Sequence, residues 1–136
     1  MRSLLAAALL GWSSAATATP TLHGACLHLL TSNTAHVPFG VREYENLIRT
    51  HTQPLTGPQP NCTHTATFQL ALTPTTAADV QLTLTLALAD HDVTPSDLQD
   101  TAYTQTLTRT LHPSDDALSA TQAILRELLA PFQAQQ

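Results

Sequence analysis

The fold of this chain is decided by residues 80–90, VQLTLTLALAD. Every second position holds a large aliphatic side chain, namely Val80, Leu82, Leu84, Leu86 and Leu88. Glutamine, threonine or alanine lies at the positions between them. Alternation with a period of two is typical of a β-strand that has one face in a hydrophobic core and the other near water. We therefore predict a strand here, against which the rest of the chain pairs or packs.

Two further stretches alternate in the same way, residues 63–73 (THTATFQLALT) and residues 102–111 (AYTQTLTRTL). Only the turn-like PTTAAD separates the first from the central run, so an antiparallel hairpin is the simplest pairing. In the second, Gln105 and Arg109 interrupt the apolar face, which favours a strand at an edge of the sheet. A short apolar run at residues 21–31 (TLHGACLHLLT) predicts one more strand.

Two segments have helical periodicity. Apolar side chains recur at helical spacing in residues 41–50 (VREYENLIRT), which predicts a short amphipathic helix. The prolines and glycine of residues 53–60 (QPLTGPQP) then predict a loop. Near the C-terminus, Ser114 is a suitable N-cap for a second helix. Its apolar stripe includes Leu125 and runs to about Ala130, and Pro131 marks its expected end.

These elements follow the order β-α-β-β-β-α. Two helices that cover one face of a mixed or antiparallel sheet of about four strands form a two-layer α+β domain. We expect residues 19–136 to form a single domain of this class, because no linker or internal repeat divides them. The uncovered face of the sheet would then be the threonine-rich one.

The first eighteen residues have the pattern of a cleaved signal peptide. Arg2 precedes an apolar stretch at residues 3–12, and Ala16-Thr17-Ala18 is a small-x-small cleavage site. Such a stretch is too short to cross a hydrocarbon core of about 30 Å as a helix. We expect an exported protein, periplasmic or extracellular, that does not span the membrane.

Cys26 and Cys62 are the two cysteines of the chain. In an exported protein they predict one disulfide, which would close a loop of about 35 residues and stabilise the fold by roughly 4 kcal/mol. The sequence LHGAC leaves open a second interpretation, in which Cys26 is a lipidated N-terminus. His23 and Gly24 fit a lipidation motif poorly. A metal site would need the paired cysteine spacing that is missing here.

The charge of the chain argues against nucleic acid as a partner. The net charge is −5, and after the leader there are four arginines and no lysine. No basic patch is therefore available to neutralise phosphates or to bind an anionic membrane surface.

No motif for catalysis or cofactor binding is recognisable, so we nominate no catalytic, cofactor-binding or metal-ligating residue and expect no cofactor. Asp90, His91 and Asp92 lie in an acidic stretch with Asp97 and Asp100, but the spacing is not that of a calcium loop. The histidines are scattered along the chain: His23, His28, His36, His51, His64, His91 and His112.

Threonines recur at every second position of the predicted strands. The candidate binding surface consists of Thr65, Thr67, Thr83, Thr85, Thr104, Thr106 and Thr108. The simpler explanation is that threonine is a favoured solvent-facing strand residue in a chain with few charges. The alternative is a flat recognition surface for ordered water, a polysaccharide or another sheet.

The element order from Pro38-Phe39 to the final helix resembles the small periplasmic α/β domains of the TolB N-terminal and penicillin-binding-protein-activator type. The strand that ends in Ala89-Asp90 is similar to the Leu-x-Leu-x-Asp strand end of such domains. The resemblance covers most of the chain after the predicted signal peptide and implies protein–protein binding in the cell envelope. It transfers no functional residue.

Three hypotheses for function follow. The first is a small exported, non-enzymatic binding module of the bacterial cell envelope with a protein partner. The second is a secreted hydrolase or metal-dependent enzyme, which a pocket containing His91, Asp92 and another histidine would favour. The third is a structural exported protein with a threonine-rich sheet surface.

Overall fold

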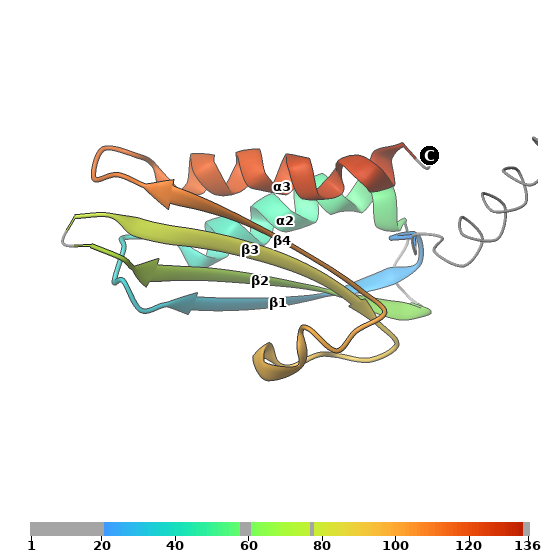
Figure 1. The fold of residues 1–136 in the computed structure, drawn as a ribbon. Coiled ribbons are helices and arrows are strands. Elements are labelled where there is room, and N and C mark those ends of the chain that lie inside the picture. The colour runs from blue at the N-terminus through green and yellow to red at the C-terminus, as the bar shows by residue number, and fades with distance from the viewer. Residues whose placement is uncertain (1–20, 58–60, 77, 135–136) are drawn as a thin grey trace, which may run out of the picture.

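The computed structural model describes residues 21–57, 61–76 and 78–134. The elements are β1 (Ala25–Asn33), α2 (Val41–Thr56), β2 (His64–Pro74), β3 (Val80–Ala89), the 3-10 turn η1 (Pro95–Asp97), β4 (Tyr103–Leu111) and α3 (Ala117–Gln133) (Figure 1). The sheet order is β1-β2-β3-β4, with β1 parallel to β2 and the other neighbours antiparallel. The predicted α+β class and the order β-α-β-β-β-α are confirmed.

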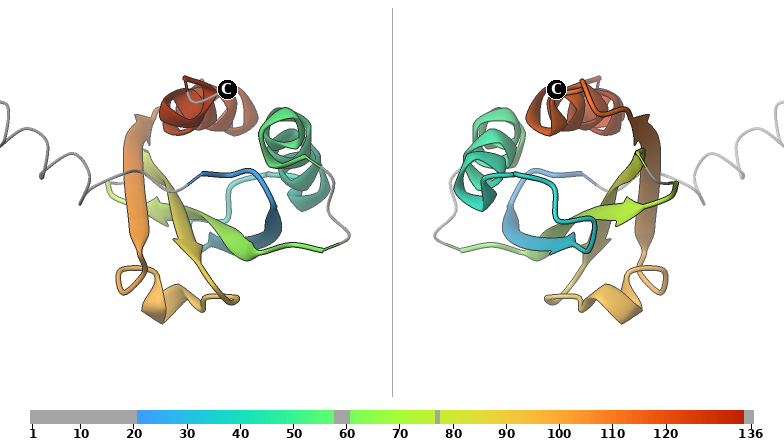
Figure 2. Two further views of the ribbon diagram at one scale, coloured as in Figure 1. Left: turned by 90° about the vertical axis from the view of Figure 1, so that its right-hand side faces the viewer. Right: turned by 90° about the vertical axis from the view of Figure 1, so that its left-hand side faces the viewer.

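Both helices cover the same face of the sheet, as the two end-on views show (Figure 2). The core lies in this interface, where the alternating apolar residues of β2 and β3 meet buried residues of α2 and α3. Phe68 and Leu84 are fully buried there, as the period of two predicts. We call the opposite side of the sheet the outer face.

The parallel pairing of β1 and β2 requires the chain to cross from one end of the sheet to the other, and α2 makes this crossover. Tyr44 of α2 is fully buried, and its hydroxyl donates a hydrogen bond of 3.2 Å to the carbonyl of Phe68 in β2. Burial raises the pKa of Tyr44 well above its usual value. The neutral hydroxyl therefore remains a donor that holds the helix on the sheet.

Helix α2 is longer than predicted. The loop expected at residues 53–60 was wrong for its first part, because the helix includes Pro54 and ends at Thr56. Leu55 and Thr56 are buried, so packing on the sheet offsets the cost of a proline in the last turn. The chain leaves the helix at Gly57, whose φ of 74° suits glycine.

Both ends of helix α3 also differ from the prediction. The N-cap is Asp116 and not Ser114; its carboxylate accepts hydrogen bonds from the backbone and hydroxyl of Ser119, which lower the pKa of Asp116. The helix continues through Pro131, because Phe132 is buried in an edge-to-face contact with Tyr103, 5.4 Å between ring centres.

The segment between β3 and β4 folds back beneath the outer face, on the side opposite the helices (Figure 1). Val93 and Leu98 are buried in this segment and pack against Ala87 of β3. The sequence shows these residues as isolated apolar positions in an acidic stretch. In the fold they anchor a flap over one end of the outer face.

The predicted disulfide between Cys26 and Cys62 is confirmed, with the two Cα atoms 5.4 Å apart. A sulfur bonded in this way is not free to carry a lipid, so the disulfide favours the first of the two interpretations of Cys26. A structural disulfide is typical of an oxidising, exported compartment. The predicted signal peptide, residues 1–18, lies outside the described residues. Within the described part of the chain, no helix is long and apolar enough to cross a membrane.

Candidate functional site

The strand register places the seven predicted threonines on the outer face. Residues that pair across strands share a face, and Thr85 pairs with Thr106 while Thr83 pairs with Thr108. The hydroxyls of these pairs lie 3.0 Å and 3.3 Å apart, within hydrogen-bonding distance. The alternation of the sequence therefore predicted the shared face correctly.

The seven threonines differ in how far they are buried. Thr65, Thr67 and Thr85 are buried, although they point to the outer face. Thr104 contacts the flap at residues 90–102, because its hydroxyl donates to the carbonyl of Leu98 at 2.8 Å. The sequence could not show this contact, because it depends on a chain segment that returns across the sheet.

The part of the outer face beyond the flap is uncharged. Cross-strand pairing brings together Leu30, Ser32, Gln69, Ala71, Thr73, Gln81, Thr83, Thr85, Thr106, Thr108 and Thr110. We call this set the open outer face. Of the threonines that the sequence predicts for the binding surface, Thr106 and Thr108 are exposed in this set. No member of the set carries a charge, so the surface offers hydroxyl, amide and methyl groups alone.

Gln69 lies within the open outer face and was not singled out in the sequence. It is 9% exposed, and its side-chain amide donates to the carbonyl of Leu70 at 3.2 Å. Its buried Oε1 atom has no hydrogen-bond partner among the residues that the structure describes. A buried acceptor without a donor costs about 1–3 kcal/mol, which makes this position unfavourable for the isolated chain.

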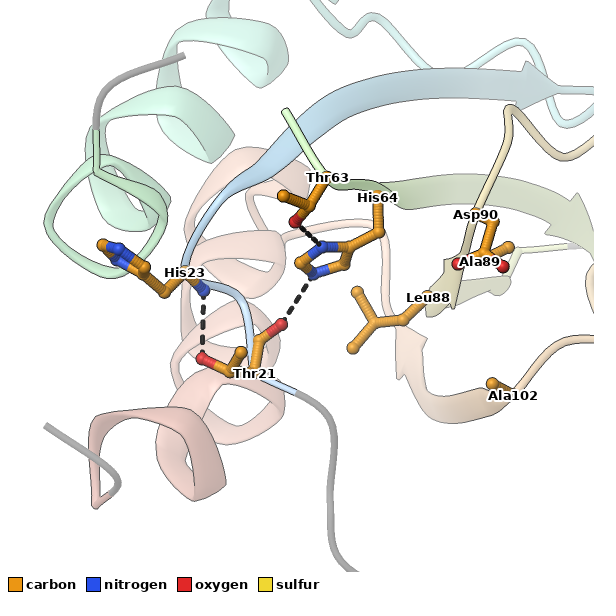
Figure 3. A pocket seen from close by; sticks show the side chains of 8 residues that line it. All are labelled: Thr21, His23, Thr63, His64, Leu88, Ala89, Asp90 and Ala102. Atoms are coloured by element: carbon orange, nitrogen blue, oxygen red, sulfur yellow. Dashed lines mark hydrogen bonds between the residues drawn. The ribbon is translucent and has the colours of Figure 1, made fainter. Parts of the chain in front are cut away.

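A second candidate is an open pocket of about 390 Å³ at the end of the sheet where β2 begins and β3 ends. Its lining residues are Thr21, His23, Thr63, His64, Leu88, Ala89, Asp90 and Ala102 (Figure 3). They come from four separate parts of the chain, and sequence reasoning did not group them.

His64 is held by hydrogen bonds at both ring nitrogens (Figure 3). Nδ1 lies 2.8 Å from the hydroxyl of Thr63, and Nε2 lies 2.8 Å from the carbonyl oxygen of Thr21. A carbonyl only accepts, so Nε2 must carry the proton in the neutral ring. Nδ1 is then the acceptor, and Thr63 donates to it. This is the arrangement of a hydroxyl and an oriented base.

The pocket does not bring together His91, Asp92 and another histidine, the grouping that would favour an enzyme. The histidine His91 and the acid Asp92 do not line this pocket, whereas Asp90 does. The side chain of His23 points away from His64 (Figure 3). Among residues 21–57, 61–76 and 78–134, no group of three histidine, cysteine or acidic side chains could hold a metal ion.

A second hollow, of about 270 Å³, lies at the opposite end of the sheet beside the β2–β3 turn. His112 lines it, and its Nδ1 lies 3.1 Å from a carboxylate oxygen of Asp79. The hydrogen bond and the charge of Asp79 raise the pKa of His112. The exposed pair fastens the end of β4 to the hairpin, which is a structural role.

Comparison with known proteins adds no assignment, because no protein family, curated protein or solved structure matches this chain.

Proposed function

We propose that this protein is a small exported, non-enzymatic binding module of the bacterial cell envelope, and that the open outer face is its docking surface. The observation that supports this proposal is the uncharged character of that face in a protein of net charge −5. Both helices pack on the other side of the sheet (Figure 2). The disulfide is typical of an exported protein, and we place this protein in the cell envelope because its element order resembles that of periplasmic domains.

The chemistry of the open outer face suits a protein partner with an uncharged, hydrogen-bonding surface. Docking would desolvate hydroxyls and amides at lower cost than charges. Thr106 and Thr108 lie on a rigid strand, so little conformational entropy is lost when they bind. The unsatisfied oxygen of Gln69 is a further acceptor that a small local movement could offer to a donor of the partner.

The test is site-specific photo-cross-linking in the native envelope. A photoreactive residue at Thr106 or Thr108 should give one discrete adduct, whereas the same residue at Thr50, an exposed threonine of α2, should give none. Thr106→Arg should reduce the adduct formed from position 108, and Thr50→Arg should leave it unchanged. Equal labelling from all three positions, or none from the sheet, would reject the proposal.

A secreted hydrolase remains the second candidate, because the Thr63 hydroxyl and His64 have the geometry of a nucleophile and its base. Its test is the hydrolysis of p-nitrophenyl acetate by the disulfide-bonded protein. The enzyme hypothesis requires Thr63→Val and His64→Phe each to remove turnover. Activity that survives both substitutions would come from another source.

A further inference from the structure

Strand β1 forms one edge of the sheet and lacks the features that usually protect an edge. Its sequence, ACLHLLTSN, contains no lysine, arginine, acid or proline. Among the residues that the structure describes it pairs with β2 alone, so the backbone groups on its other side face outward along residues 27–32. An uncharged edge of nine residues is a template for another strand.

The opposite edge, β4, is protected. Arg109 places a charge on this strand and forms an ion pair of 3.2 Å with Glu127 of α3. The hydroxyl of Thr101 donates to the carbonyl of Tyr103 at 2.9 Å. The two edges therefore differ in chemistry, and the difference singles out β1.

Three leucines of β1 are only half-buried, although the strand adjoins the core. Leu27 and Leu29 face the helices and pack against the core cluster, while Leu30 lies on the outer face. A strand added beside β1 would cover the remaining surface of all three. Burial of this apolar area would favour association.

We propose that β1 pairs antiparallel with β1 of a second copy of this chain, around a two-fold axis at Leu29. The two four-stranded sheets then form one continuous sheet with the helices of both copies on one face. In this register Leu29 opposes Leu29, Leu27 opposes Thr31, and His28 opposes Leu30. Opposed residues share a face, as strand pairing requires.

A second copy is favoured over an unrelated strand for reasons of charge and shape. The strand opposes itself in a symmetric pair, and because it carries no Lys, Arg, Asp or Glu, it creates no like-charge contact between such residues. The two β1 strands have the same length and twist because the two copies have the same sequence. The pairing uses the edge at β1 and leaves Thr106 and Thr108 on β4, at the other edge of the sheet, uncovered, so it does not depend on the proposed function.

Sedimentation velocity of the disulfide-bonded chain over a concentration series tests the proposal. The unmodified protein should be dimeric at about 100 μM. Thr31→Lys, at an exposed position of β1, should weaken the dimer at least about tenfold, because lysine is a common protector of strand edges. The matched variant Thr108→Lys, on the exposed part of β4, should dimerise normally.

Hydrogen exchange of the unmodified chain provides a second readout that needs no variant. Amides of residues 27–32 should become more protected as concentration rises, while those of β4 should not change. A monomer at all concentrations, or equal weakening by Thr31→Lys and Thr108→Lys, would overturn the proposal. Since neither readout involves a partner protein, this failure would leave the cross-linking test of the outer face intact.

Discussion

Gln69 illustrates how one side chain can be unfavourable for folding and still suit a binding surface. Its Oε1 is buried without a donor in the described part of the chain, while its neighbours Thr85 and Thr106 satisfy each other. The sequence places Gln69 correctly on the outer face by alternation. It cannot show the burial, which arises from packing among four strands.

We expect Gln69→Met to raise the free energy of unfolding by about 1 kcal/mol. Methionine has a similar length and removes the unsatisfied acceptor, and replacement of such a group by an apolar one is neutral or stabilising. Urea denaturation of both proteins is the measurement. A loss of more than about 1 kcal/mol would mean that Oε1 has a donor in solution.

The contacts of His64 show that sequence patterns are equally limited in predicting the candidate sites. Thr63 and His64 are neighbours in the chain, but the orientation of the ring depends on Thr21, 43 residues away from His64. No local pattern encodes that distance. Of Asp90 and Asp92, two acidic residues that the sequence drew attention to, only Asp90 lines the pocket.

At the scale of elements, proline was a poor guide to helix ends. Pro54 and Pro131 both lie inside the last turn of a helix, where local rules predict termination. Each is next to a residue that the core buries, Leu55 and Phe132. Burial of a large apolar side chain is worth roughly 2 kcal/mol, comparable to the proline penalty, so tertiary packing decides the boundary.

Helix α3 provides a direct test of the core assignment. Leu125→Ala should lower the free energy of unfolding by about 2–5 kcal/mol, because Leu125 is fully buried and truncation leaves a cavity. Leu118→Ala, on the same helix but half-exposed, should cost less than half as much. Chemical denaturation compares the two variants. Equal losses would contradict the position of α3 on the sheet.

At the scale of the whole molecule, the disulfide joins the first strand to the entry of the second across a sequence separation of 36. It restricts the unfolded chain over the entire β1–α2 crossover. This long-range link is important in a small domain, where the hydrophobic core alone supplies limited stability.

The double variant Cys26→Ala, Cys62→Ala should unfold with a free energy about 4 kcal/mol lower than that of the oxidised protein, by the chain-entropy estimate. Denaturation with and without reductant is the measurement. The reductant should destabilise the unmodified protein to a similar degree and leave the double variant unaffected. Insensitivity of the unmodified protein would show that the disulfide contributes little.

The sequence by itself determined the strands, their order, the helix faces and the cysteine pair. Periodicity is a local property, and it specifies which side chains face a core wherever that core is. Only the tertiary structure decided that β1 runs parallel to β2, that the flap contacts Thr104, and that His64 meets Thr21. These features depend on which distant segments pack together, and the balance of burial against local propensity sets that choice.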